Sequence, residues 1–144
     1  MNKHLHLFFT LLFFIYLHTS LNAQTGKWQE GFARADGFTV VNGVEIQFQQ
    51  VNCNGNASLF LKLINNNNYT VELSWEDAVL NSNNDWVKNK NTFLKSVTLN
   101  PNEKLEGSCE SKLSQLKLNL ADFSAANNFK YFKAAQLNIN PISK

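Results

Sequence analysis

Histidine is scarce in this chain of 144 residues, and all three copies, His4, His6 and His18, lie close to the N-terminus. They fall in a segment that is expected to be removed on export, so the exported protein should contain none. Histidine is the most common general base at neutral pH and a frequent metal ligand. We therefore expect neither a metal site nor a cofactor.

Other signatures of known chemistry are missing as well. The sequence has no Gly-x-Ser-x-Gly elbow, no glycine-rich phosphate loop, no Asp-x-Asp-x-Asp-Gly calcium loop and no Cys-x-x-Cys pair. The net charge of the whole chain is only +2. Because nucleic acids and anionic membranes require a basic surface, neither is expected as a partner.

The first 23 residues form a predicted signal peptide. Lys3 and His4 precede an apolar run over residues 5–17, and Leu21-Asn22-Ala23 provides a small-residue cleavage site. The run is shorter than the roughly 20 residues that a spanning helix needs, and no cysteine stands directly after the cut to carry a lipid anchor. We predict cleavage after Ala23, no transmembrane anchor, and a secreted or periplasmic protein.

The rest of the chain is long enough for one domain. Residues 24–37 contain three glycines and no regular period, which predicts a loose N-terminal arm. Residues 38–144 form the expected sandwich domain. The 22 asparagines of the chain concentrate between apolar segments, where their tolerance of left-handed backbone favours turns.

Apolar residues in the predicted domain alternate with period two, as in strands with one buried face. Strands are expected at residues 44–48, 59–63, 69–75, 78–80, 85–87, 93–99, 104–109, 116–120 and 135–139. Two hairpins are expected, one joining 59–63 to 69–75 and one joining 78–80 to 85–87. Segment 116–120 could also be counted as helix, but Leu116, Leu118 and Leu120 alternate. The fold class predicted is all-β: an antiparallel immunoglobulin-like β-sandwich of about seven or eight strands.

The two cysteines, Cys53 and Cys109, are predicted to form one disulfide, because an exported chain meets an oxidising compartment. A redox-active or metal-binding pair is the alternative. The spacing of the two cysteines and the lack of histidine disfavour it.

Carboxylates are one group of candidate functional residues. Glu72, Glu76, Asp77 and Asp85 fall around the second predicted hairpin. Two of them could face each other as the acid and base of a hydrolase, or several could hold calcium. Their spacing also suits solvated charges at the ends of a hairpin.

Aromatic rings are the other candidates, because a ring exposed on a β-surface can stack on a sugar or anchor a protein partner. Trp75 ends an inward-facing alternation and is predicted to be core. Trp86 follows an asparagine-rich loop and could be either hairpin packing or an exposed platform. Trp28 lies in the arm, where it could dock back on the sandwich or contact a partner. Trp28, Trp86 and Asp85 are the predicted contact residues.

Part of the chain resembles small secreted or periplasmic bacterial proteins that have an immunoglobulin-like sandwich and no assigned activity. The resemblance rests on these runs: Asn67-Asn68-Tyr69-Thr70-Val71, Leu73-Ser74-Trp75, Asp85-Trp86-Val87, Leu99-Asn100-Pro101-Asn102-Glu103 and Glu106-Gly107-Ser108-Cys109. It implies the fold and export, and it brings no catalytic residue.

The sequence therefore predicts a non-enzymatic secreted or periplasmic module that binds an unidentified protein or glycan at the cell envelope. The alternatives are a carbohydrate-binding module with exposed aromatic residues, a small carboxylate-dependent hydrolase, and a structural part of an envelope assembly that pairs through an uncovered edge strand.

Overall fold

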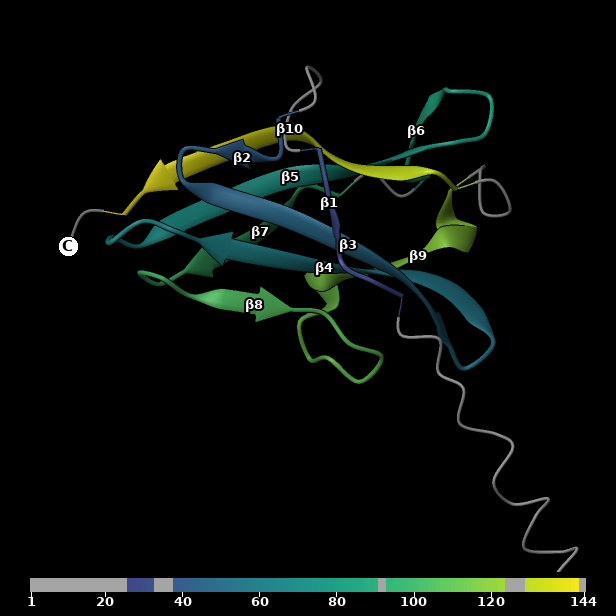
Figure 1. Cartoon of the computed structure of the whole chain (residues 1–144), viewed down its shortest axis with the longest axis horizontal. Coiled ribbons are helices and arrows are strands. Elements are labelled where there is room, and N and C mark those ends of the chain that lie inside the picture. The colour runs from purple at the N-terminus through teal and green to yellow at the C-terminus, as the bar shows by residue number, and fades with distance from the viewer. Residues whose placement is uncertain (1–25, 33–37, 91–92, 124–128, 143–144) are drawn as a thin grey trace, which may run out of the picture.

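The computed structural model describes residues 26–32, 38–90, 93–123 and 129–142. In these ranges the chain forms two antiparallel β-sheets packed face to face (Figure 1). None of the helices described there has the length and hydropathy of a membrane span. The predicted signal peptide lies outside the described residues.

The two sheets share the strands unequally. The first sheet has the order β1-β3-β4-β8, with β2 also on β3 and β9 also on β4, and the second has the order β10-β5-β6, with β7 also on β5. The strands of the first sheet are β1 (Gln29–Glu30), β2 (Val40–Val41), β3 (Val44–Cys53), β4 (Asn56–Asn65), β8 (Lys104–Glu106) and β9 (Lys117–Asn119). Those of the second are β5 (Val71–Leu80), β6 (Trp86–Lys88), β7 (Lys95–Leu99) and β10 (Tyr131–Pro141). Two short 3-10 helices, η1 (Ser114–Leu116) and η2 (Leu120–Asp122), flank β9.

The predicted all-β sandwich is confirmed, and so are the inward faces of its long strands. Val44, Ile46, Phe48, Leu59, Leu61, Leu63, Val71, Leu73 and Trp75 are each at most 1% exposed. They belong to one core cluster that both sheets supply. Burying each large apolar side chain contributes about 1.5–3 kcal/mol relative to leaving it in water. Tyr69, expected to continue the inward set, is 42% exposed because it precedes β5.

The predicted hairpin between residues 59–63 and 69–75 is wrong. The first segment lies in β4 and the second in β5, and these strands belong to different sheets. The chain instead turns back tightly at Asn54-Gly55, where both residues have positive φ (53° and 85°) and Cys53 pairs with Asn56. Positive φ at two successive residues is the type I′ geometry that Asn-Gly favours. The other predicted hairpin, β5 with β6, is confirmed.

A buried asparagine explains why the chain changes sheets after β4. Asn65 is 0% exposed, and its Nδ2 donates to the carbonyls of Tyr69 (2.9 Å), Asn100 (2.8 Å) and Leu99 (3.4 Å). Its Oδ1 accepts from the backbone N–H and the Nδ2 of Asn67, both at 3.0 Å. The side chain thus joins the β4–β5 connection to the turn after β7.

Replacing this side chain gives a first testable prediction. Asn65→Ala is expected to lower the free energy of unfolding by about 2–4 kcal/mol, because several buried backbone groups lose their partner. Urea denaturation measures the change. Asn68→Ala is the matched control, since Asn68 is exposed in the same connection. A cost for Asn65→Ala no larger than that of the control would refute the role of Asn65.

The described part of the predicted arm is not loose, so that prediction is corrected. β1 pairs with β3, and the Gly31 N–H donates to the carbonyl of Ile46 at 2.8 Å. One residue later, the Phe32 N–H donates to the carbonyl of Phe132 at 3.0 Å, and the Phe32 carbonyl accepts from the Ala134 N–H at 2.9 Å. The segment changes from one sheet to the other within four residues, which is why no period appears in its sequence. It joins the two sheets on the side of β3 and β10 (Figure 1).

The predicted disulfide between Cys53 and Cys109 is confirmed, with Cα atoms 5.6 Å apart. Cys53 ends β3 beside the Asn54-Gly55 turn, and Cys109 follows β8. The bond therefore ties a hairpin tip to a loop at the end of the first sheet. It does not cross the middle of the core, unlike the disulfide of antibody domains.

Candidate functional site

Trp86 stands at the outer face of the second sheet. The Asn81 Oδ1 atom accepts from the backbone N–H groups of Asn83 and Asp85, both at 2.9 Å, and this shapes the loop that leads into β6. Trp86 then pairs with Leu80, the neighbour of the buried Val79. Because side chains alternate along a strand, Trp86 and Leu80 face outward. Trp86 is 38% exposed.

One ring and one ammonium group contact Trp86. The Phe32 ring meets it edge to face, with centroids 6.1 Å apart, and stacks on Tyr131 at 4.3 Å. The Lys133 ammonium lies 4.3 Å from the centroid of the Trp86 ring. Such ring pairs contribute about 0.5–1.5 kcal/mol beyond their buried area, and an exposed cation–π contact about 0.5–1 kcal/mol. We call Phe32, Trp86 and Tyr131 the aromatic ledge.

Polar groups surround the aromatic ledge. The Lys130 Nζ donates to the Oδ1 of Asn84 at 3.1 Å, next to the start of β6. Farther along the same face, the Glu76 carboxylate accepts from Lys88 at 2.6 Å and from the Nε2 of Gln136 at 3.2 Å. The rings are therefore bordered by ammonium, amide and carboxylate groups.

Tyr131 keeps its phenolic proton at neutral pH. Burial raises the pKa of Tyr131 above its ordinary value, and the negative charge of Glu30 raises it further. A neutral phenol can both donate and accept a hydrogen bond. The aromatic ledge thus has a polar tip on one of its rings.

The structure separates the predicted contact residues. Trp28 is half-buried on the outer face of the first sheet, with the Lys62 ammonium 4.1 Å from its ring centroid. It has docked back on the sandwich and does not meet Trp86. Asp85 is exposed beside Trp86 in sequence, and its carboxylate accepts from the Asn81 Nδ2 at 3.5 Å.

The four candidate carboxylates do not face one another. Asp77 is buried on the inner side of β5, where it accepts from the Lys95 Nζ at 2.6 Å and the Trp75 Nε1 at 2.9 Å. Burial raises the pKa of Asp77, and the Lys95 charge opposes that rise. Glu72 and Glu76 point to the opposite side of the strand, and Asp85 lies in the loop after it. They do not form the facing acid–base pair that the hydrolase alternative requires.

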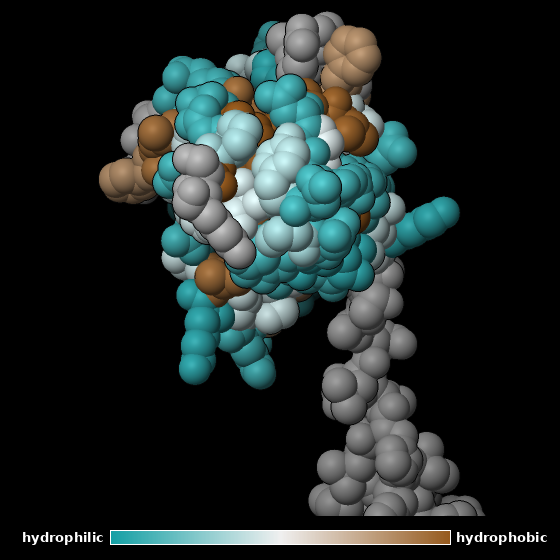
Figure 2. Space-filling model, turned by 90° about the vertical axis from the view of Figure 1, so that its left-hand side faces the viewer, coloured by the Kyte–Doolittle hydropathy of each residue, from teal (hydrophilic) through white to brown (hydrophobic). Residues whose placement is uncertain are grey.

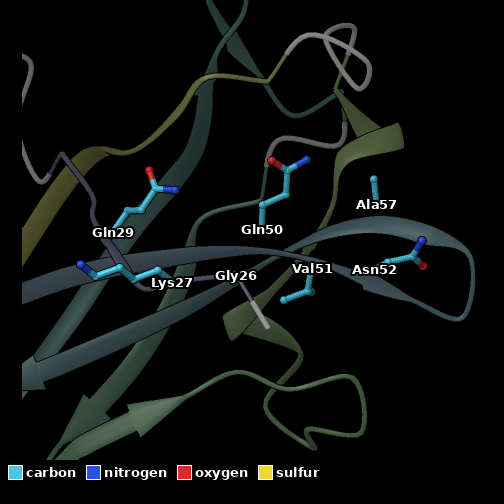
Figure 3. Close-up of a pocket in the computed structure, with 7 residues that line it drawn as sticks. All are labelled: Gly26, Lys27, Gln29, Gln50, Val51, Asn52 and Ala57. Carbon is cyan, nitrogen blue, oxygen red and sulfur yellow. The ribbon is translucent and has the colours of Figure 1, made fainter. Parts of the chain in front are cut away.

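A separate hollow of about 530 Å³ lies beside the β3–β4 hairpin (Figure 3). It is lined by Gly26, Lys27, Gln29, Gln50, Val51, Asn52 and Ala57. These residues supply amides and one ammonium group, but no aromatic ring and no carboxylate. The aromatic ledge combines a stacking surface with charged neighbours, so we take it as the candidate site.

Other exposed apolar side chains lie outside the aromatic ledge. Phe38, Val40, Tyr69, Phe93, Leu94 and Ile142 are all between 42% and 72% exposed. At the end of the molecule seen in Figure 2, hydrophobic atoms appear in separate places between hydrophilic ones. That end does not show a broad apolar surface of the kind that marks a large protein interface.

Comparisons with known proteins do not assign the chain to a family. No family model and no curated protein matches it. Among solved structures, the chain is similar to a DUF1425 family member from Shewanella sp. pv-4, with 13% identity, coverage of 73% of this chain and 88% of that one, and a TM-score of 0.44. A likeness at this level supports no conclusion about function. The relationship to small bacterial immunoglobulin-like proteins stays a prediction.

Proposed function

We propose that this chain is an exported, non-enzymatic binding module that holds a saccharide on the aromatic ledge. The observation that carries the proposal is the exposed Trp86 ring, held by Phe32 and Lys133 and bordered by hydrogen-bonding side chains. A flat ring can stack on the apolar face of a sugar, while polar neighbours bind its hydroxyl groups.

Binding is favoured over catalysis by the placement of the ionisable groups. The candidate carboxylates are divided between the two sides of β5 and a loop, whereas hydrolysis of a glycoside needs two of them on either side of one bond. The histidines lie only in the predicted leader. Export is supported by that leader and by the Cys53–Cys109 bond, because disulfides persist mainly in oxidising compartments.

A small polar ligand is favoured over a large protein partner. A stable protein interface covers about 800 Å² on each partner and has an apolar centre. The aromatic ledge offers the exposed Trp86 ring with Lys88, Lys130 and Glu76 nearby, and the end of the molecule in Figure 2 shows hydrophobic residues in separate places. This composition suits a sugar ring better than a protein surface.

The proposal is tested by binding to a panel of purified neutral and acidic polysaccharides. For a saccharide that the wild-type protein binds, Trp86→Ala is expected to weaken binding tenfold or more, which corresponds to a loss of about 1.4 kcal/mol of binding free energy. Trp86→Tyr should keep most of the affinity, because it retains a stacking ring. Phe93→Ala, which removes a 72% exposed ring outside the aromatic ledge, is the control. The proposal is wrong if the wild-type protein binds none of the saccharides, or if Trp86→Ala binds them with the affinity of the wild-type protein.

A further inference from the structure

We infer that the saccharide bound at the aromatic ledge is anionic, carrying carboxylate or sulfate groups. This inference rests on the proposed function and names the ligand class for the same site. It comes from Lys133, whose ammonium group lies over the Trp86 ring, and from Lys130, whose ammonium group binds Asn84 in the loop before β6.

Six described lysines, Lys130 and Lys133 among them, have no carboxylate partner among the described residues, and Lys133 differs from the others of this group in lying on the Trp86 ring. Within the described ranges, Lys62, Lys88, Lys95 and Lys104 each lie within 4 Å of a carboxylate oxygen. Lys133 instead rests on the Trp86 ring, and Lys130 on the amide oxygen of Asn84. Neither has a carboxylate partner among the residues that the structure describes.

The contacts of these lysines leave room for an anion. An ammonium group has three N–H donors. A cation–π contact uses its charge but no directed hydrogen bond, so Lys133 keeps donors for a ligand stacked on Trp86. Lys130 uses one of its three N–H donors in the hydrogen bond to the Oδ1 of Asn84.

Three acids lie near these lysines. Glu76 is paired with Lys88 at 2.6 Å. Among the described residues no lysine pairs with Asp85, which accepts from the uncharged Asn81 amide, or with Glu30, whose charge acts on Tyr131. The charged group in contact with the Trp86 ring is the Lys133 ammonium at 4.3 Å, so an anionic group on a sugar over Trp86 would meet that cation first. At about 4 Å such a pair is worth about 1–4 kcal/mol near a protein surface, and salt weakens it.

The test compares ligands that differ only in charge. The first pair is polygalacturonate and its methyl ester, and the second is dextran sulfate and dextran. At low salt the wild-type protein should bind at least one anionic member about tenfold more tightly than its neutral counterpart. Lys133→Gln should weaken binding of the anionic member more than binding of its neutral counterpart, so that the ratio of the two affinities falls to about one. Lys112→Gln, which removes an exposed lysine outside the aromatic ledge, should behave as wild type.

The outcomes separate this inference from the proposed function. Preference for the carboxylated or for the sulfated polymer identifies which anion the lysines bind, and either result supports the inference. Equal binding of charged and neutral members, with binding still lost in Trp86→Ala, overturns the anionic class and leaves the saccharide module standing. Absence of saccharide binding at Trp86 overturns both.

Discussion

Removing the Cys53–Cys109 disulfide is expected to lower the free energy of unfolding by about 4 kcal/mol. The two cysteines are 56 positions apart in sequence, and the bond prevents the unfolded chain from exploring the conformations in which these ends separate. In the folded protein it ties the β3–β4 hairpin tip to the loop after β8. A loss of that size is a large part of the 5–15 kcal/mol that stabilises a typical domain.

Urea denaturation of the double variant Cys53→Ala/Cys109→Ala, beside the oxidised wild-type protein, measures this effect. Alanine is used because Cys53 is only 3% exposed and a hydroxyl there would need a partner. Reduced wild-type protein is the control, and it should match the double variant, since both lack the cross-link. A difference below about 1 kcal/mol would show that the disulfide contributes little to stability.

Lys95→Met is expected to cost about 3–5 kcal/mol at about pH 7, because it leaves the buried Asp77 carboxylate without its cation. The Asp77 side chain is 3% exposed, and the Lys95 Nζ lies 2.6 Å from its Oδ2. The Trp75 Nε1 hydrogen bond at 2.9 Å remains, but it carries no charge. The pair lies beside β5, where the strand changes partner from β7 to β6.

The cost of Lys95→Met should depend on pH in a defined direction. Burial raises the pKa of Asp77, and the Lys95 charge opposes this. The folded state therefore holds the Asp77 proton more tightly than the unfolded state does. Protonation of Asp77 contributes fully to the free energy of unfolding below the ordinary aspartate pKa. This contribution is lost as the pH rises through the raised pKa of Asp77 in the folded state. Without Lys95 the pKa rises further, so the variant should lose more stability than the wild-type protein between about pH 4 and pH 7.

The double variant Asp77→Asn/Lys95→Met provides the control for packing, because the Asn amide oxygen can still accept from the Trp75 Nε1. With both charges removed, no carboxylate is left stranded, and most of the lost stability should return. Urea denaturation of the single and double variants at both pH values completes the comparison. A double variant as unstable as Lys95→Met, or a cost that does not change with pH, would contradict the assignment of that cost to a buried charge.

Much of the strand pattern could be predicted from the sequence, because burial imposes a period of two. The inward positions of β3, β4 and β5 follow directly from it. The assignment of β4 and β5 to different sheets could not be predicted, because a run of asparagines suits a hairpin and a crossover equally well. The deciding contacts of Asn65 reach Leu99 and Asn100, which are distant in sequence. Asn54-Gly55 did carry a recognisable hairpin signal.

The candidate site was predicted only in part for the same reason. Trp86 follows a polar loop, which marked it as a possible platform. Phe32 and Tyr131 reach it through pairing: Leu80 lies between Trp86 and Tyr131, and Phe32 forms a bridge with Lys133. Phe32 leaves no local signal in the sequence, and Tyr131 falls in an aromatic cluster with Phe129 and Phe132 that suggests core or edge packing. The Trp28 contact with Lys62 likewise depends on how β1 joins the first sheet.

Titration of ¹⁵N-labelled protein with the saccharide retained in the binding panel tests the central claim most directly, because the three tryptophans occupy three different settings. Trp75 is buried against Asp77, Trp28 rests on Lys62, and Trp86 lies on the aromatic ledge. We predict a saturable shift of the indole N–H signal of Trp86, with the signals of Trp28 and Trp75 unchanged. A shift confined to Trp28, or no shift of the Trp86 signal at saturating saccharide, would contradict the account.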